Sequence, residues 1–532
     1  MTEHWDVVIV GAGAAGCLLA NRLSALGQKR VALIEAGPPD KDLSIHVPVG
    51  WASVAYGKKY NWPLRTVPQQ HLNNRELIWP RGRVLGGSTS TNGMIYVRGQ
   101  AQDFDDWANA GADGWDWASV LPYFKRFEQS AVAGVARGIE GELTPTVAAY
   151  STWSDQFIAS CVAAGFPARQ DYNAGEQFGA GYYEQTIADG RRINSASAFL
   201  RHARGRSNLA VKTHTQVSHL IIDDGRATAV CAFDRRGKAM VLHASQIILC
   251  AGAVHTPTIL MRSGVGCGEH LRSLGISVVL DKPGVGANLQ DHYGAMVAFE
   301  VTGGGTVKDQ LTPWGLGAEL WRYLRTRKGL LAMPSADAYL FHASSRAQRG
   351  RPDTQVHFAR ASGERDDNGR STVDKVPGVT AITYPMRPTS RGTLRLADAS
   401  LAAAPLIDPN YLATDHDKRV LIDGLRTLRQ IFNTEPLARS VQSEIRPAVD
   451  DSDLALLDYA RATGTTGYHP VGTCRMGNDE DAVVDLRLQV RGIDGLTIAD
   501  ASIMPNLVSG NTMATTYMIA ERAAEFLVES TR

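Results

Sequence analysis

The 532-residue sequence has no excess of charge of either sign. It contains 55 Lys and Arg against 54 Asp and Glu, a formal net charge of +1. A protein that binds a nucleic-acid backbone normally carries a strongly basic face. We therefore expect no nucleic-acid partner.

Long apolar runs are also missing. No stretch reaches the roughly 20 apolar residues that a membrane-spanning helix needs, and the N-terminus lacks the basic segment of a signal peptide. The six cysteines form no CxxC pair, and their spacing is not that of a zinc site, so we expect no metal. These absences favour a globular enzyme of the cytoplasm.

A nucleotide-binding pattern opens the chain. Residues 7–10 are β-branched and apolar, a GxGxxG motif follows at 11–16, and small and apolar residues then continue at helical spacing. A second apolar run at 31–34 ends on Glu35, which lies 35 − 16 = 19 residues after Gly16. This strand–turn–helix–strand unit predicts a pyrophosphate at the helix N-terminus and a ribose hydroxyl bound to the glutamate.

Similar elements recur in the middle and at the end of the chain. A helix is expected after residue 250, with Thr256 as its N-cap, Pro257 in its first turn and Gly264 at its end. Further strands are expected at 246–250 and 496–500, and a closing helix at 515–529.

The length exceeds what one hydrophobic core usually holds, so we expect two or more domains. The nucleotide-binding segments are richer in short apolar strands, whereas the rest has more aromatic residues and polar loops. We assign residues 1–155, 200–295 and 462–532 to the nucleotide-binding domain and residues 156–199 and 296–461 to a discontinuous second domain.

Four further motifs occur in a fixed order, at residues 81–94, 252–266, 468–476 and 500–505. Together with the motif at 11–16, they resemble the glucose-methanol-choline (GMC) oxidoreductase family, in its choline dehydrogenase-like branch, over essentially the whole chain. The resemblance implies an α/β fold: a Rossmann-like FAD-binding domain and a substrate domain built on an antiparallel sheet. It also implies oxidation of an alcohol CH–OH group at the flavin.

The same resemblance implies which residues bind FAD. The glycines at 11–16 hold the pyrophosphate, Glu35 the adenosine ribose and residues 86–95 the flavin ring, with Asn92 near its reactive edge. The backbone of Val217 meets the adenine, and the turn before the closing helix contacts the pyrimidine end. The implied set is Gly11, Gly13, Ala14, Ala15, Gly16, Glu35, Ala36, Gly86, Gly87, Ser88, Asn92, Gly93, Met94, Ile95, Val217, Ala251, Asp500, Ala501, Asn511, Thr512 and Met513.

Thr91 stands where some members of the family carry the histidine that binds FAD covalently. Threonine cannot form an imidazolyl linkage to the flavin. We therefore expect non-covalent FAD.

His469 lies where the family keeps its catalytic base, and a neutral imidazole is a suitable acceptor for a hydroxyl proton. The family commonly places a second His or Asn three residues before a threonine of the last helix, and alignment on Thr516 puts Met513 there. A thioether is only a weak acceptor. Three alternatives stay open: His469 acts alone, Asn511 or a group of the substrate domain replaces the partner, or this copy is impaired.

The resemblance implies that an uncharged primary alcohol, aromatic or medium-chain, becomes the aldehyde. His469 takes the hydroxyl proton, and the carbon gives hydride to flavin N5. Alternatives are an FAD-containing cyanohydrin lyase and a flavin-binding protein without turnover. The sequence leaves open whether oxygen or a quinone-like carrier reoxidises the flavin.

A basic amphipathic helix is expected at residues 315–331, with Leu316, Leu320 and Leu324 on one face. Such a helix can lie on an anionic membrane. Because the apolar stripe is short, we favour a surface helix that packs its leucines on its own domain over membrane association. Four nearby aromatic residues are candidates for an apolar pocket wall: Trp314, Trp321, Tyr339 and Phe341.

Overall fold

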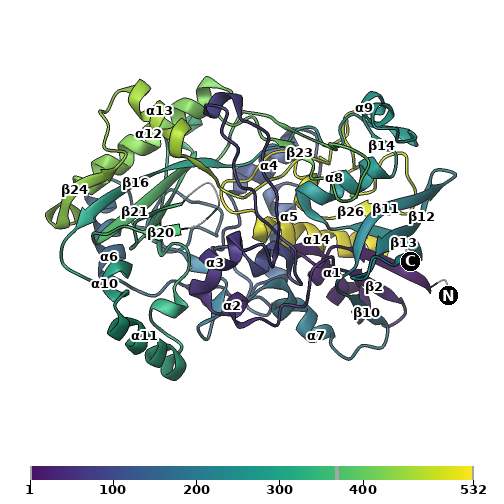
Figure 1. Cartoon of the computed structure of the whole chain (residues 1–532), viewed down its shortest axis with the longest axis horizontal. Helices are drawn as coiled ribbons and strands as arrows, with labels where there is room; N and C mark the ends of the chain where they lie inside the picture. Colours follow the sequence, from purple (N-terminus) through teal and green to yellow (C-terminus); the bar gives the residue numbers. More distant parts are fainter. Residues whose placement is uncertain (1–2, 133, 366–368, 370, 530–532) are drawn as a thin grey trace.

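The computed structural model describes residues 3–132, 134–365, 369 and 371–529. Figure 1 shows two large sheets at opposite ends of the molecule, with the closing helix α14 (Met513–Glu529) between them. Both ends of the chain lie beside the nucleotide-binding sheet. The predicted α/β architecture with two unlike sheets is confirmed.

The nucleotide-binding sheet is built around the first strand of the chain. Its central strands run parallel, and their Val, Ile and Leu side chains are buried on both faces, as a parallel sheet covered by helices requires. Two antiparallel strands extend one edge. The order is β10 (Leu209–Lys212), β2 (Val31–Ile34), β1 (Glu3–Val10), β13 (Ala239–Leu249), β12 (Arg226–Phe233) and β11 (Gln216–Asp223), with β26 (Leu496–Ile498) also paired to β13.

Helices α1 (Ala14–Ala25) and α8 (Gly252–Arg262) follow strands of this sheet, as predicted. The expected start of α8 was wrong, because the helix begins at Gly252 and both Thr256 and Pro257 lie inside it. The Thr256 hydroxyl is not a cap but donates to the Asp500 carboxylate at 2.6 Å. The predicted end is confirmed by Gly264, which takes a φ of +82° that favours glycine.

The second sheet is antiparallel, as expected for a substrate domain. Helices α6 (Thr152–Ala163) and α12 (Asp415–Phe432) cover one face, where aromatic rings stack to form a separate core. The domain limits given above stay a prediction. The strand order is β24 (Val441–Arg446), β16 (Tyr293–Val301), β21 (Gly378–Pro385), β18 (Thr354–Ala359), β17 (Ala338–His342) and β6 (Gly179–Tyr182), and β25 (Thr465–Thr466) also pairs with β16.

Shorter elements connect and cover the two sheets. The other helices are α2 (Leu43–His46), α3 (Trp51–Tyr56), α4 (Ala101–Asn109), α5 (Trp117–Phe127), α7 (Arg201–Ala203), α9 (Gly268–Ser273), α10 (Val307–Gln310), α11 (Pro313–Thr326) and α13 (Asp453–Thr463). The other strands are β3 (Asn61–Trp62), β4 (Arg81–Gly82), β5 (Thr146–Val147), β7 (Glu184–Gln185), β8 (Ile187–Ala188), β9 (Arg191–Arg192), β14 (Val265–Gly266), β15 (Leu280–Asp281), β19 (Gly363–Arg365), β20 (Ser371–Val373), β22 (Thr393–Arg395) and β23 (Leu406–Asp408).

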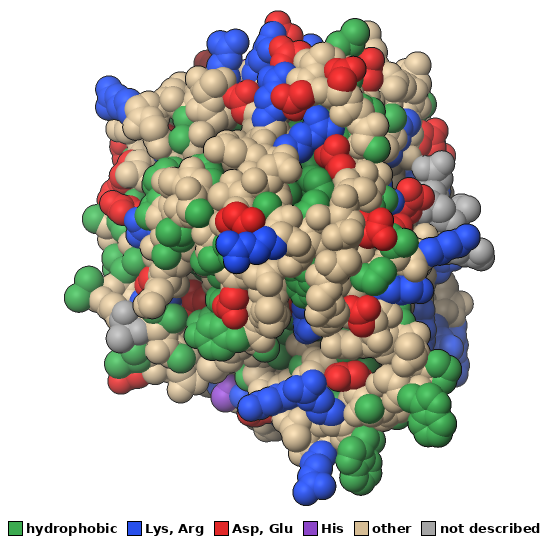
Figure 2. Space-filling model, turned by 90° about the vertical axis from the view of Figure 1, so that its left-hand side faces the viewer, with side chains coloured by type: hydrophobic (Ala, Val, Ile, Leu, Met, Phe, Trp, Pro, Cys, Tyr) green, Lys and Arg blue, Asp and Glu red, His purple; other side chains and the backbone are tan. Residues whose placement is uncertain are grey.

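Helix α11 does not pack its leucines on its own domain, which corrects the interpretation favoured above. Leu316, Leu320 and Leu324 are each about half exposed. Figure 1 shows α11 standing out from the substrate end, and Figure 2 shows apolar side chains projecting beside basic ones at the lower edge of this face. Within the described ranges, no helix is long and apolar enough to span a bilayer.

Candidate active site

One cavity of about 870 Å³ runs from the glycine-rich turn to the substrate sheet. It is lined by nearly every residue that the sequence assigned to FAD; Gly16 and Gly86 are the two exceptions among them. The residues of that set on the cavity wall are Gly11, Gly13, Ala14, Ala15, Glu35, Ala36, Gly87, Ser88, Asn92, Gly93, Met94, Ile95, Val217, Ala251, Asp500, Ala501, Asn511, Thr512 and Met513.

The glycines shape the turn by letting backbones touch. A Cβ on Gly11 would lie 2.6 Å from the Cys250 carbonyl oxygen, and a Cβ on Gly16 only 1.9 Å from the oxygen of Gly11. A Cβ on Gly87 would lie 2.7 Å from the Cα of Gly13, so the flavin loop presses on the first turn. The N-terminus of α1 therefore opens on the cavity without side chains in the way, which fits a pyrophosphate.

Two buried carboxylates, Glu35 and Asp500, line the end of the cavity next to the glycine-rich turn. Glu35 accepts hydrogen bonds from the backbone N–H groups of Ala12 (3.1 Å) and Gly37 (2.8 Å), and burial raises its pKa to about 7. Asp500 accepts from the Gly252 backbone at 2.8 Å, and burial raises its pKa as well. Both carboxylates line the cavity, where a ribose hydroxyl could donate to Glu35 and a ribityl hydroxyl to Asp500.

His469 is held at the other end of the cavity by the residue before it. Tyr468 adopts a φ of +63°, unusual for a residue other than glycine, and its carbonyl accepts a hydrogen bond from Arg81 at 2.8 Å. The backbone N–H of His469 donates to the buried carboxylate of Asp291 at 2.6 Å. These backbone contacts fix the position of His469 independently of the hydrogen bonds of its imidazole ring.

A chain of hydrogen bonds determines the tautomer of His469. The Met386 carbonyl can only accept, so Nε2 of His292 (2.8 Å away) carries a proton, and Nδ1 of the neutral ring is an acceptor. His469 Nδ1, 2.9 Å from that acceptor, must therefore be the donor. This leaves the lone pair of His469 on Nε2, 2.9 Å from the amide Nδ2 of Asn511.

Burial keeps this histidine neutral. The pKa of His469 lies well below the ordinary value of 6.5, first because of burial and then because of His292, His357 and Arg81. Burial lowers the pKa of His292 to about 4. The neutral form assumed in assigning the tautomers therefore holds at neutral pH.

Asp291 forms a polar support behind His469. Its carboxylate also accepts hydrogen bonds at 2.5 Å from the hydroxyls of Tyr411 and Thr466, and Trp79 donates to the same tyrosine oxygen at 2.9 Å. Burial raises the pKa of Asp291, while these hydrogen bonds favour its charged form. A negative charge beside the His469 backbone suits a ring that gains a proton.

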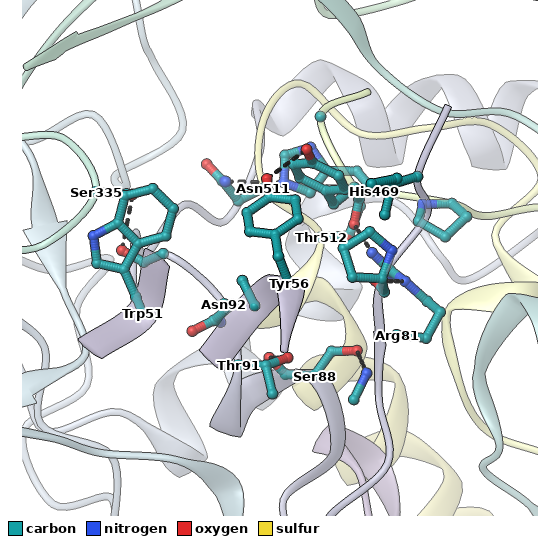
Figure 3. Close-up of a pocket in the computed structure, with 18 of the residues that line it drawn as sticks. Trp51, Tyr56, Arg81, Ser88, Thr91, Asn92, Ser335, His469, Asn511 and Thr512 are labelled. Atoms are coloured by element: carbon teal, nitrogen blue, oxygen red, sulfur yellow. Dashed lines mark hydrogen bonds between the residues drawn. The ribbon is translucent and has the colours of Figure 1, made fainter. Parts of the chain in front are cut away.

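The polar neighbour of His469 is Asn511, one of the alternatives left open above for the partner expected at position 513. The Met513 sulfur instead accepts a hydrogen bond of 3.5 Å from Nδ2 of Asn92. The oxygen of that asparagine accepts from Arg192 at 2.6 Å, a buried guanidinium whose pKa burial lowers to about 9. In Figure 3, His469 and Asn511 lie together, and Asn92 lies below them in the view.

His292, Asp291 and Arg81 were missed as site residues by the sequence. An antiparallel bridge between Gln290 and Val471 places residue 292 opposite residue 469, although 177 positions separate them. No local pattern around His292 carries that information.

The cavity wall also contains aromatic and apolar side chains. It contains Trp51 and Tyr56 of α3, Met296 of β16, and Met333, and the Tyr56 hydroxyl lies 2.6 Å from that of Tyr468. The four aromatic residues proposed for this wall do not line it. Trp314 and Trp321 are on the surface, and Tyr339 and Phe341 are buried in a neighbouring core.

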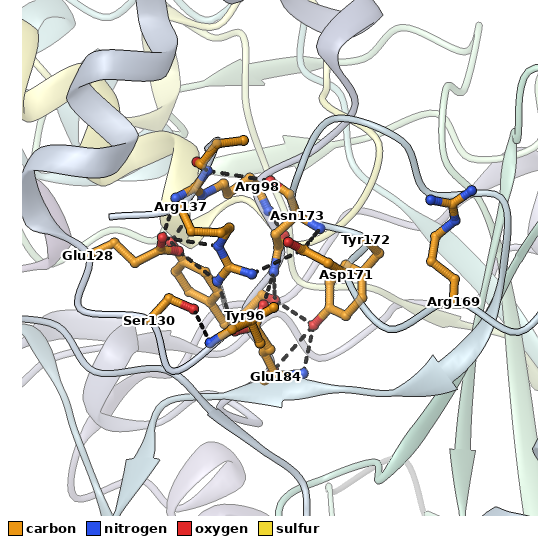
Figure 4. Close-up of polar contacts among 12 residues, drawn as sticks. Tyr96, Arg98, Glu128, Ser130, Arg137, Arg169, Asp171, Tyr172, Asn173 and Glu184 are labelled. Carbon is orange, nitrogen blue, oxygen red and sulfur yellow. Dashed lines mark hydrogen bonds and ion pairs between the residues drawn. The ribbon is translucent and has the colours of Figure 1, made fainter. Parts of the chain in front are cut away.

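A buried ionic network anchors the chain that follows the flavin loop (Figure 4). Glu128 accepts hydrogen bonds from Tyr96 (2.9 Å), from the side chain of Arg137 (3.0 Å) and from Arg98. Arg137 also pairs with Glu184 at 2.8 Å. Residues 96–98 are thereby tied to Glu128 and, through Arg137, to Glu184.

The geometry agrees with comparisons to known proteins. Sequence models of the GMC oxidoreductase family match residues 5–294 and 388–520. The chain is 41% identical to alcohol dehydrogenase (acceptor) of Pseudomonas putida, over 98% of this chain and 96% of that protein, and 37% identical to mitochondrial choline dehydrogenase of Homo sapiens, over 99% and 90%. The solved pyridoxine 4-oxidase of Mesorbium loti is 32% identical with a TM-score of 0.89, over 98% of both chains.

These matches span most of the chain, and the cavity offers the glycine cradle and the carboxylates that FAD requires. The chain therefore belongs to the GMC oxidoreductase family, whose members use FAD to oxidise CH–OH donors.

Proposed function

We propose that this enzyme oxidises an uncharged primary alcohol, aromatic or medium-chain, to the aldehyde, with His469 as the base. The observation that carries the proposal is the lone pair on Nε2 of a neutral His469, beside the Asn511 amide. The roles of these residues, and of the FAD-contacting set on the cavity wall, are part of the proposal.

The charges of the cavity support an uncharged substrate. Among its described lining residues, the carboxylates are Glu35 and Asp500, both engaged at the cofactor end, and Glu76 and Glu364, both exposed to solvent. None is a buried counter-ion for a cation. Choline, the substrate in the names of several relatives, is therefore the comparison substrate for the test.

Side chains of the protein would accept the hydroxyl proton of the alcohol. An alcohol oxygen lying against both nitrogens accepts a hydrogen bond from Asn511 Nδ2 and donates its own proton to Nε2 of His469. The ring then shares its Nδ1 proton with His292, and the Asp291 carboxylate stabilises the positive charge. When bound, FAD supplies the acceptor for the hydrogen that leaves the alcohol carbon with its electron pair.

Anaerobic mixing of the purified enzyme with alcohols tests this function. Bleaching of the flavin by benzylic or medium-chain alcohols, with little effect from choline, is the expected result. Preferential bleaching by choline would overturn the substrate class. A cyanohydrin added to the same panel tests the lyase, which would release cyanide from it without bleaching the flavin. No change with any of these compounds would favour a flavin-binding protein without turnover.

The electron acceptor and the cellular location belong to the proposal as predictions. Either oxygen or a quinone-like carrier reoxidises the flavin in a cytoplasmic enzyme. Return of the yellow colour in air, compared with its return on addition of a soluble quinone, separates the two acceptors.

The acid limb of the pH profile should lie below the ordinary histidine range. His469 is active when neutral, that is, above its pKa, and burial places this pKa well below 6.5. We therefore expect kcat/KM with a non-ionising alcohol to stay flat from neutral pH down through 6.5 and to fall at more acidic pH. A limb centred at or above the ordinary value would contradict a buried, neutral base.

Asn511 and Met513 should differ in their effect on catalysis. Asn511→Ala removes the donor next to His469, and we expect it to lower the rate of flavin reduction about a hundredfold. Met513→Leu keeps the volume of an apolar side chain and should change this rate by less than about threefold. Stopped-flow reduction of both variants measures the difference, and the opposite ranking would restore Met513 as the partner.

FAD should dissociate from the denatured chain. Thr91 lies on the cavity wall and cannot link to the flavin through an imidazole. Acid precipitation should leave all yellow colour in the supernatant, whereas colour in the pellet would indicate a covalent bond elsewhere.

A further inference from the structure

Helix α11 exposes a continuous apolar arc. At 100° per residue, its apolar side chains occupy an arc of about 160°, from Leu316 through Leu320 and Leu324 to the two tryptophans. Trp314 is 91% and Trp321 66% exposed. A monomeric protein seldom leaves five large apolar side chains together in water, so this face calls for a partner.

The helix is attached to the protein by residues outside this arc. Tyr323 is buried and donates a hydrogen bond to the Gly190 carbonyl at 3.0 Å. Glu319 accepts from the backbone of Leu330 at 2.7 Å, and Thr312 caps the first turn by accepting from Gly315. The apolar arc is therefore held outward by the fold and is not a face that could turn inward.

Basic residues border the arc at the C-terminal end. Arg322, Arg325, Arg327 and Lys328 are all exposed, and only Arg322 pairs with an acid on the helix, Glu319 at 3.3 Å. Among the described residues, no carboxylate forms an ion pair with the other three. The surface thus combines leucine and tryptophan with unpaired positive charge, the composition of a helix that binds anionic lipid.

We propose that α11 docks the enzyme onto an anionic membrane, with its apolar arc in the headgroup boundary and its basic residues against lipid phosphates. A second copy of the chain fits less well. It would bring a second set of the same unpaired positive charges to the contact, and like charges across an interface repel.

The docking helix leads directly to the cavity. Helix α11 is followed by the short helical turn at Leu330–Ala332 and then by residues 333–335, which line the cavity. The turn at Leu330–Ala332 also packs against the short helical turn Pro48–Gly50, which leads into α3. Trp51 and Tyr56 of α3 line the cavity. Docking would therefore hold one wall of the active site at the membrane surface, where lipid-soluble alcohols and quinones concentrate.

Vesicle flotation of the FAD-loaded enzyme tests the proposal independently of its substrate. Vesicles of phosphatidylcholine with phosphatidylglycerol should carry the enzyme upward, and vesicles of phosphatidylcholine alone should carry much less. Added salt should weaken the binding, because it screens the exposed charges. Absence of binding to both vesicles would overturn the proposal whatever the enzyme oxidises.

Matched variants show whether α11 is responsible. Each of Trp321→Ser and Leu320→Ser should lower the partition coefficient about tenfold, and Arg325→Gln about fivefold. Leu454→Ser is the control, because this residue of α13 is also 68% exposed. All four should keep the turnover of a water-soluble alcohol. An equal loss of vesicle binding in Leu454→Ser would overturn the assignment of the membrane contact to α11. A dimer in solution that dissociates in Trp321→Ser would overturn it as well.

Discussion

Replacement of His469 by Gln is expected to slow the reduction of the flavin by alcohol about a thousandfold. Gln resembles His in size and can donate and accept hydrogen bonds, but it cannot take a proton at neutral pH. General-base catalysis by a positioned side chain contributes about a hundred- to ten-thousandfold. Anaerobic stopped-flow measurement gives the rate directly, and the FAD absorbance shows that the cofactor site is intact. A loss of less than about tenfold would remove His469 from this role.

A variant at His292 tests the tautomer of His469 and leaves the base itself in place. His292→Leu removes the acceptor of the Nδ1 proton, so the His469 ring can take the tautomer with its proton on Nε2. We expect this to lower the rate about a hundredfold. His342→Leu is the matched control, because His342 is a buried histidine of β17, in the sheet whose strand β16 begins directly after His292, and it does not line the cavity. Equal losses in both would indicate general disturbance of the sheet.

The cofactor end of the site was predictable because its signals are local. The GxGxxG turn, Glu35 and the flavin loop each combine residues within a few positions, and a strand followed by a glycine turn has few alternatives. The structure therefore places all three on one cavity. The fold class follows in the same way from short apolar runs at the beginning, middle and end of the chain.

The catalytic end was less predictable because its contacts depend on pairing between distant segments. His292 reaches His469 through a bridge that only the folded chain forms. The family pattern gives Met513 by its spacing from Thr516, whereas the folded chain brings the Asn511 amide against His469. Likewise, the spacing of leucines in α11 predicts an apolar face but not whether the protein covers it.

The network around Glu128 should dominate the stability of the flavin loop. Glu128 and its partners Arg98 and Arg137 are fully buried, and Glu128 also accepts from the backbone of Gly138 at 2.9 Å. Burial alone would raise the pKa of this carboxyl, but the two guanidinium groups hold it below the ordinary value. Its stabilising charge is therefore present at neutral pH and is lost only as the pH falls through the lowered pKa.

Glu128→Gln should therefore destabilise the enzyme by about 3–5 kcal/mol, because it leaves two arginines buried with too little negative charge. Unfolding in urea, followed by tryptophan fluorescence and by FAD release, measures this loss. Glu529→Gln removes the exposed partner of Arg487, 2.9 Å away, and should cost less than about 1 kcal/mol. Because Tyr96 donates to Glu128 and follows the flavin loop directly, FAD should be released at lower urea than the fluorescence change in Glu128→Gln alone. Similar losses in the two variants would mean that the buried network is no stronger than a surface ion pair.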